Sequence, residues 1–284
     1  MKKIIDKIKI LIKEINTFGQ LCKSNHLDSH SAAAAFFMFV SIIPVFILLI
    51  AIIPFTPLTD KMILNIVEFL LPNKMDSFAI GVVKQLTERS ITAIWISAIA
   101  AIWSASRSIV TIKQGLNEIR GENDTRNFVI VRINGAFYVV ILIVSFVLLL
   151  VINVIFTGID RYFREVLEIS ISAKYDLVYI IMQLRPLITI IVGFLLNLYI
   201  FTFLPNDKIK IKSQIPGAVI VALLWYVFTT LFGIYINYFN AYSMYGSLSI
   251  VIIVLFWLYA CMYILFLGGQ FNYYLSLRRE NDTI

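Results

Sequence analysis

Six long apolar runs alternate along the chain with more polar segments. They lie near Ala32–Ile53, Ile91–Ile112, Asn134–Phe156, Leu177–Phe203, Ile215–Ile236 and Ser247–Phe271. About 20 residues of helix cross the ~30 Å hydrocarbon core of a bilayer, so each run is long enough to span a membrane. The runs are unbroken, whereas strands of a membrane barrel alternate over about 10 residues. We therefore predict an all-α, polytopic membrane protein with six transmembrane helices.

The composition supports this class. Hydrophobic residues make up 60% of the 284 residues, charged residues make up 14%, and the mean hydropathy is +0.88. A soluble domain of this length does not need so much apolar surface, and only helices or closed barrels satisfy their backbone hydrogen bonds in lipid. No polar linker divides the chain. We interpret residues 1–284 as a single integral membrane domain.

Positive charge is distributed unevenly between the segments that join the runs. With the N-terminus inside, 15 lysines and arginines fall on the cytoplasmic side, including Lys113, and 7 fall on the outer side. The positive-inside rule therefore predicts that both termini are cytoplasmic. This asymmetry explains the net charge of +7 without nucleic acid as a partner. It favours membrane lipids with anionic headgroups as the partners of the basic side. The predicted localisation is multi-pass, in the cytoplasmic (inner) cell membrane.

Residues 1–30 are predicted to form an amphipathic cytoplasmic helix ahead of the first run. Its apolar residues recur at helical spacing: Ile4, Ile8, Leu11, Ile12, Ile15 and Phe18. Lysines occupy the other faces, a pattern typical of a helix in the membrane interface. The alternative is a surface helix packed on the bundle. Between the first two runs, residues 54–90 are expected to form two short extracytoplasmic helices.

Two arginines lie inside the runs, which contain no Asp or Glu. A charge at membrane depth is energetically costly unless an opposite charge or a polar group compensates it. Such a residue is therefore a candidate functional residue by default. Arg107 shares one face of the second run with Ser104 and Thr111, at spacings of three or four. Two structural alternatives stay open. Arg107 reaches the inner headgroups along its own side chain, or it pairs with Glu118 or Glu122.

Arg185, in the fourth run, lies farther from a charged segment. It follows Leu177 by eight residues, roughly 12 Å of helix at about 1.5 Å per residue. The adjacent Pro186 frees the carbonyl of residue 182, a possible acceptor for the guanidinium. Thr189 and Asn197 continue a polar line toward the inside. Arg185 either lines a polar cavity and meets an anionic headgroup or solute, or it holds freed carbonyls and outer-loop acids as a packing residue.

The sequence contains few residue patterns that would support enzymatic catalysis or metal binding. The runs hold no histidine or carboxylate, so a serine there has no general base, and no phosphate-binding or dinucleotide fingerprint occurs. His26 and His30 stand one helical turn apart, but a transition-metal site needs a third ligand, and the spacing matches no zinc pattern. Cys22 and Cys261 predict no disulfide. Gly268–Gly269 is interpreted as a close-packing site. We expect no enzymatic activity, no cofactor and no metal.

Three stretches carry a family resemblance in the order in which they occur. They are Ser31–Pro44, then Trp103–Val110 with Leu116, Asn117 and the Arg126/Phe128/Arg132 connector, and finally Tyr245–Ser249 with Trp257–Tyr259, Gly268, Gly269 and Asn272. Together they resemble the family called YihY or virulence factor BrkB. The resemblance implies a six-helix inner-membrane protein, and members have been associated with serum resistance and envelope lipid traffic. Relatives have also been labelled ribonuclease BN, a reading rejected here because such nucleases need clustered His and Asp ligands.

The sequence favours a transporter or flippase-like protein for an anionic lipid or envelope amphiphile. Arg185 would engage the headgroup in the outer half of the membrane, and Arg107 would engage it in the inner half. The path between them would be lined by Thr189, Asn197, Ser104 and Thr111. A non-transporting scaffold that recruits partners and a small-anion channel are the alternatives. The sequence does not indicate an oligomeric state.

Overall fold

The computed structural model describes residues 2–52, 91–122, 177–206, 209–239 and 247–281, together with 133, 135, 137, 138 and 141. The long helices within these ranges are α1 (Lys2–Ser24), α2 (Leu27–Ile52), α5 (Ile91–Ile119), α7 (Leu177–Phe203), α8 (Ile211–Phe239) and α9 (Ser247–Asn281). The described part of the chain is all-helical, which confirms the predicted class.

Five of the predicted spans coincide with described helices. The bounds of α7 are those predicted, whereas α2, α5, α8 and α9 extend beyond the apolar runs at one or both ends. Within the described ranges, three segments are long and apolar enough to cross a membrane: Pro186–Phe203, Ile211–Ile236 and Val251–Arg279. Of the predicted span at 134–156 only residues 135, 137, 138 and 141 are described, and the short helices expected within 54–90 lie outside the residues that the structure describes, so six spans remain a prediction.

The N-terminal helix ends earlier than predicted. A single helix was expected over residues 1–30, but α1 ends at Ser24 and α2 begins at Leu27. His26 lies between them with φ of 46°, in the left-handed region, where a right-handed helix cannot continue. Leu27 is only 1% exposed, so the start of α2 is anchored in the core. His30 therefore belongs to the first long apolar helix.

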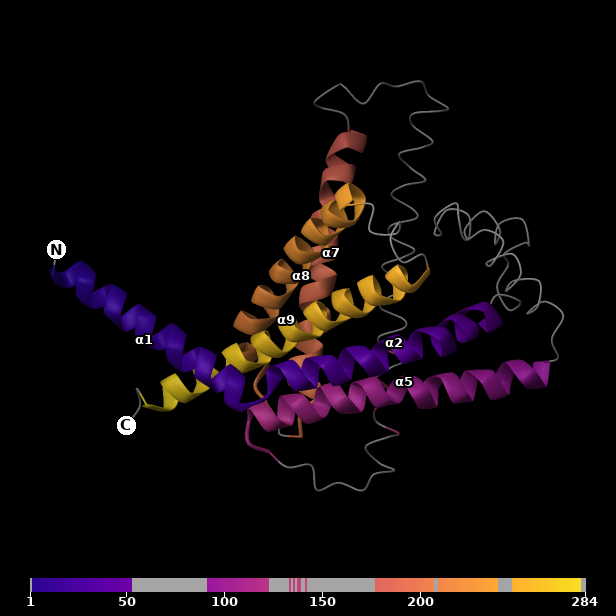
Figure 1. Cartoon of the computed structure of the whole chain (residues 1–284), viewed down its shortest axis with the longest axis horizontal. Coiled ribbons are helices and arrows are strands. Elements are labelled where there is room, and N and C mark those ends of the chain that lie inside the picture. Colours follow the sequence, from indigo (N-terminus) through magenta and orange to yellow (C-terminus); the bar gives the residue numbers. More distant parts are fainter. Residues whose placement is uncertain are drawn as a thin grey trace.

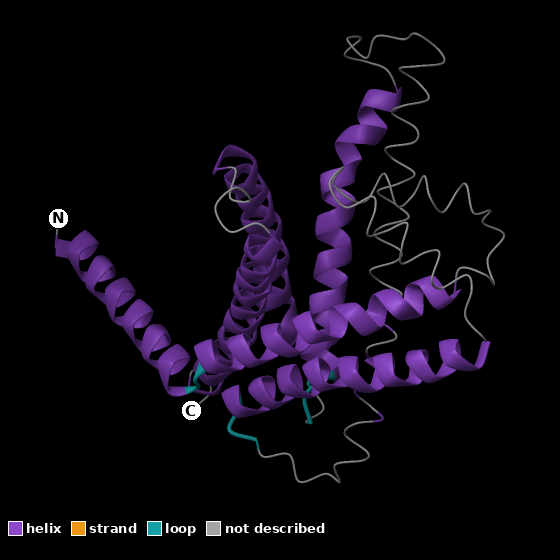
Figure 2. Cartoon of the chain, turned by 45° about the vertical axis from the view of Figure 1, so that its right-hand side comes forward, coloured by secondary structure: helices purple, strands orange, loops and turns teal. Residues whose placement is uncertain are grey.

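The helices form two pairs that are connected through α9. In Figure 1, α2 lies along α5 and α7 lies along α8, and α9 contacts members of both pairs. The two pairs run in different directions from a shared end, which Figure 2 shows from a second side. The turn between α1 and α2 lies near the C-terminal part of α9 at this shared end, and α1 projects away from it.

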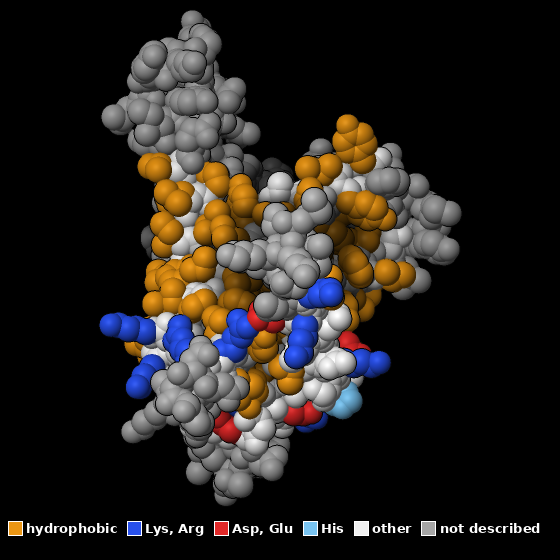
Figure 3. All heavy atoms as spheres, turned by 90° about the vertical axis from the view of Figure 1, so that its left-hand side faces the viewer, with side chains coloured by type: hydrophobic (Ala, Val, Ile, Leu, Met, Phe, Trp, Pro, Cys, Tyr) orange, Lys and Arg blue, Asp and Glu red, His pale blue; other side chains and the backbone are white. Residues whose placement is uncertain are grey.

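The outer surface of the pairs is apolar. On α8 the exposed side chains include Val219, Leu223, Leu224, Val227, Leu231 and Ile234. Contiguous apolar patches of this kind are rare on soluble monomers and indicate contact with lipid or protein. Figure 3 shows apolar side chains over both arms of the molecule, with Lys and Arg gathered in a band below them. This is the distribution expected of helices that face lipid and end in a basic surface.

Two glycines allow α8 and α9 to cross closely. A Cβ atom on Gly217 would lie 2.4 Å from the carbonyl oxygen of Gly268, and one on Gly268 would lie 2.2 Å from Cγ2 of Val221. Small residues at such crossings let helix backbones approach, which supplies packing energy that lipid-exposed leucines cannot. The interpretation of Gly268–Gly269 as a close-packing site is confirmed.

Candidate functional site

Arg107 lies on α5, and its guanidinium packs over an aromatic ring of α2. Its Cζ atom is 4.9 Å from the ring centroid of Phe37, within the range of a cation–π contact. The arginine side chain is otherwise exposed. It precedes Ile119, the last residue of α5, by twelve residues, roughly 18 Å at about 1.5 Å per residue. Among the described residues, the charge is thus held within the apolar helix by a ring and not by a carboxylate.

The two acids that the sequence offered as partners for Arg107 are bonded elsewhere. Glu118 Oε2 lies 2.8 Å from His30 Nε2 on α2. Glu122 Oε1 accepts a hydrogen bond from Arg120 Nε at 3.1 Å. Eleven residues of helix, roughly 16 Å at about 1.5 Å per residue, separate Arg107 from the nearer acid. The alternative in which Glu118 or Glu122 neutralises Arg107 is therefore wrong.

Thr111 and Ser104 occupy the predicted stripe on α5. Thr111 is buried, and its Oγ1 donates a hydrogen bond to the carbonyl oxygen of Arg107 at 3.0 Å. Because the hydroxyl proton is used within the helix, Thr111 has only acceptor capacity left for a ligand. Ser104 lies on α5, but its side chain is outside the described set.

Of the three predicted site residues on α7, the structure describes the side chains of Thr189 and Asn197 but not that of Arg185. Arg185 lies on the helix directly before Pro186, through which α7 continues, and its side chain is outside the described set. Asn197 is fully buried. Its Nδ2 donates to the carbonyl oxygen of Gly193 at 2.8 Å, and its Oδ1 has no hydrogen-bond partner in the part of the chain that the structure describes. Thr189 is partly exposed.

The six predicted site residues divide between the two helix pairs. Arg107, Ser104 and Thr111 belong to the α2–α5 pair, and Arg185, Thr189 and Asn197 belong to the α7–α8 pair. The side-chain donors of Thr111 and Asn197 both bond within their own helices. The described contacts therefore do not join the two groups into one lined path, and that path stays a prediction.

Carboxamides at the shared end of the bundle, most of them buried, form a cluster that the sequence did not predict as a site. We call this cluster the junction: Asn25, Asn117, Asn206, Gln214, Gln270 and Asn272. Asn25 Nδ2 donates to Gln270 Oε1 at 2.7 Å, which ties the α1–α2 turn to α9. The backbone N–H of Asn206 donates to Asn117 Oδ1 at 3.1 Å, which ties the α7–α8 link to α5.

Asn272 fastens α9 to the beginning of α8. Its Oδ1 accepts a hydrogen bond from the backbone N–H of Gly217 at 2.8 Å. Its Nδ2 donates to the backbone oxygen of Gln214 at 3.2 Å and to Gln214 Oε1 at 3.0 Å. The side chain is 2% exposed, so these bonds replace water that cannot reach it. Asn272 therefore positions the helix crossing at Gly217.

Two junction donors have no hydrogen-bond partner within the described residues: Asn117 Nδ2 and Gln270 Nε2. On α5, one turn before Asn117, Lys113 is only 5% exposed. The sequence placed Lys113 in the segment that follows the second run on the cytoplasmic side. In the structure α5 continues through this residue to Ile119 and carries it into the packed interior, while the side of the membrane stays a prediction. A polar residue within or beside an apolar run was the signal for all three, since amides and charges are costly there.

Comparison with known proteins establishes the family. The model of virulence factor BrkB matches residues 20–283. The chain belongs to the virulence factor BrkB family. The family match covers every described helix except the first part of α1, and it confirms the resemblance stated from the sequence. No solved structure matches this BrkB-family chain at a significant level.

Curated relatives of this BrkB-family chain carry two kinds of name. Ribonuclease-like protein YfkH of Bacillus subtilis is 28% identical over 89% of this chain and 91% of its own length. UPF0761 membrane proteins of Pseudoalteromonas translucida and Idiomarina loihiensis are 29% and 34% identical, over 36% and 30% of this chain. The chain spans about a third of the length of these two relatives, at 34% and 29%. With the lipid-facing helices, these relatives identify a multi-pass membrane protein.

Proposed function

We propose that this BrkB-family protein moves an anionic amphiphile, a lipid or an envelope precursor, across the membrane. The observation that carries the proposal is Arg107. Its guanidinium is exposed beside Phe37 within an apolar helix, while Glu118 and Glu122 are bonded to His30 and Arg120. A cation in such a place gains most from an anion that comes from outside the protein.

The chemistry of the two arginines fits a phosphate or carboxylate headgroup. A guanidinium binds such groups through two parallel N–H donors, and these bonds strengthen where water is scarce. The apolar runs contain no Asp or Glu, which disfavours proton coupling through intramembrane carboxylates. Arg185 supplies the second cation, in the half of the membrane away from the junction.

The ribonuclease-like name belongs to the Bacillus relative, and for this chain we propose no nuclease activity. The sequence holds two histidines. His30 is bonded to Glu118, and His26 forms the turn between α1 and α2. Among the described residues, no group of three or more His, Cys, Asp or Glu side chains is arranged to hold a metal ion.

A lipid-movement assay tests the proposal. Purified protein is reconstituted in liposomes that contain phosphatidylglycerol labelled on one acyl chain with a dithionite-sensitive fluorophore, and the rate at which inner-leaflet label becomes reducible is measured. We expect Arg107→Gln and Arg185→Gln to slow this rate roughly tenfold or more, since a hydrogen bond to a charged group contributes about 1.5–3 kcal/mol. Arg120→Gln, the same change at an arginine that lies in the turn directly after α5 and is already paired with Glu122, is the matched control and keeps the rate.

Three outcomes contradict the proposal. Full lipid movement by both Arg107→Gln and Arg185→Gln shows that the arginines do not engage the headgroup. Chloride flux without lipid movement by the unaltered protein identifies a small-anion channel. Neither flux nor lipid movement, in protein that remains monodisperse, identifies a scaffold.

A further inference from the structure

The apolar stripe of α1 is covered at one end and uncovered at the other. Near the bundle, the ring of Phe18 packs edge-on against Phe271 and Tyr274 of α9, with centroids 6.3 and 5.8 Å apart. One and two turns earlier, Ile15 is 60% exposed and Ile12 is 52% exposed. Nothing in the described part of the chain covers these two side chains, because α1 projects away from the bundle there (Figures 1 and 2).

The projection of α1 is held in place by its base. Arg278 of α9 forms an ion pair with Glu14, and its guanidinium also lies over the ring of Tyr274, 5.6 Å from the centroid. These contacts and the Phe18 packing fix one end of a straight helix. The uncovered stripe is therefore part of a positioned element, which needs a surface to lie against.

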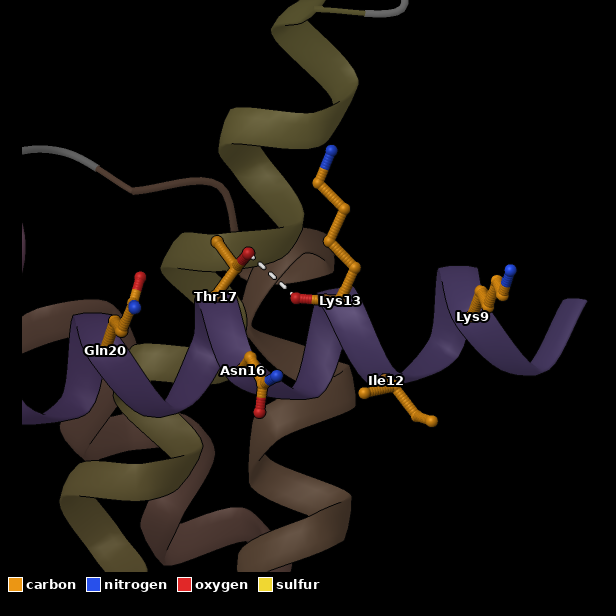
Figure 4. A pocket seen from close by; sticks show the side chains of 6 residues that line it. All are labelled: Lys9, Ile12, Lys13, Asn16, Thr17 and Gln20. Atoms are coloured by element: carbon orange, nitrogen blue, oxygen red, sulfur yellow. Dashed lines mark hydrogen bonds between the residues drawn. The ribbon is translucent and has the colours of Figure 1, made fainter. Parts of the chain in front are cut away.

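The charge of α1 indicates what kind of surface the uncovered stripe would lie against. The helix carries six lysines and two acids, and Glu14, one of these acids, is paired with Arg278. Beside the stripe, Lys9 and Lys13 border a shallow groove of about 440 Å³, whose other lining residues are Ile12, Asn16, Thr17 and Gln20. Figure 4 shows Lys13 and Ile12 extending to opposite sides of α1. One helix thus presents apolar and cationic sides together.

We propose that α1 lies in the interface of an anionic bilayer, with Ile12 and Ile15 among the acyl chains and its lysines on the headgroups. An amphipathic helix gains from apolar burial and from attraction to anionic lipid at the same time. A second copy of α1 on the same stripe would bring two sets of lysines together, and their repulsion opposes that pairing. The proposal concerns a resting contact with lipid and does not depend on transport.

Depth measurements on the full-length protein test this proposal. With Cys22 and Cys261 replaced by Ala, a nitroxide is attached at Ile15→Cys or, as the matched control on the polar side of the same helix, at Thr17→Cys. In nanodiscs that contain phosphatidylglycerol, we expect oxygen to relax the Ile15 label more than a water-soluble nickel chelate does. We expect the reverse order at Thr17. In nanodiscs of phosphatidylcholine alone, the difference between the two positions shrinks.

Charge variants test whether attraction between the lysines of α1 and anionic lipid determines the depth of the Ile15 label. Lys9→Gln with Lys13→Gln should lower the depth of the Ile15 label in anionic nanodiscs, whereas Lys210→Gln with Lys212→Gln, the same loss of charge at exposed lysines at the beginning of α8, should not. A water-exposed Ile15 label in every lipid overturns the proposal. So does a depth that is independent of lipid charge, or spin–spin broadening that reveals a second copy on the stripe. None of these readouts involves lipid movement, so the proposed transport function can fail while this inference holds.

Discussion

Gly217→Ala is expected to loosen the crossing of α8 and α9. The added Cβ atom would lie 2.4 Å from the carbonyl oxygen of Gly268 and 2.5 Å from Nδ2 of Asn272. Real Cβ atoms essentially never approach another heavy atom within 3.0 Å, so either the two backbones separate or Asn272 leaves its place. A backbone oxygen cannot rotate away as a flexible side chain would.

The size of the effect follows from three contributions. Overpacking at a tight contact costs about 1–3 kcal/mol. Displacement of Asn272 from the backbone N–H of Gly217 removes a hydrogen bond, which contributes about 1 kcal/mol. Replacing Gly by Ala within a helix returns up to about 1 kcal/mol. The net loss of stability is therefore about 1–3 kcal/mol.

The assay is equilibrium unfolding in mixed micelles with increasing sodium dodecyl sulfate, followed by tryptophan fluorescence. Gly233→Ala is the matched control, because Gly233 lies on the same helix and a Cβ atom there would have no neighbour within 4 Å. We expect the control to be as stable as the unaltered protein or more stable, by up to about 1 kcal/mol. If Gly217→Ala unfolds at the same detergent fraction as Gly233→Ala, the reasoning about this crossing is refuted.

Other consequences of the structure are open to simpler measurements. Asn272→Leu removes the hydrogen bonds of Asn272 with the backbone N–H of Gly217 and with Gln214 and should cost about 1–3 kcal/mol in the same titration, while Asn16→Leu on the exposed side of α1 should change little. Burial raises the pKa of the Cys22 thiol, so less thiolate is present at pH 8. Iodoacetamide should therefore alkylate Cys22 more slowly than a Ser24→Cys variant, whose side chain is exposed, and raising the pH should narrow the gap. Purified protein should not hydrolyse RNA with or without added manganese; metal-dependent cleavage that copurifies with the protein and is lost in His30→Ala would contradict the proposed absence of nuclease activity.

The long helices could be predicted because their signal is local. An apolar run of about 20 residues with at most one charge specifies a membrane-spanning helix almost regardless of its neighbours. This is why α7 has the predicted bounds. Helix ends depend on less visible features. The break before α2 falls on His26, with no Gly or Pro to mark it, and α5 continues through Lys113 because that lysine is packed in the interior.

The candidate site was less accessible to sequence reasoning because its contacts are distant along the chain. Asn25 and Gln270 are bonded across 245 positions, and each alone resembles an ordinary polar residue near the end of a span. The contact of Arg107 with Phe37 likewise requires the pairing of α2 with α5. Sequence reasoning could identify Arg107 as an uncompensated cation, but it could not decide that Glu118 is occupied by His30.

The positions of Arg107 and Arg185 constrain the route that a transported headgroup would take. Arg107 lies roughly 18 Å of helical rise from the junction end of α5, and Arg185 lies roughly 27 Å from the junction end of α7, at about 1.5 Å per residue. They belong to different helix pairs, and α9 contacts both pairs. A headgroup that met both cations would therefore pass between the pairs and along α9. Under the proposed function, Arg107→Gln should slow entry from the leaflet at the junction more than exit, and Arg185→Gln should show the opposite asymmetry. Equal slowing from both leaflets by each variant would argue that the cations act together at one site.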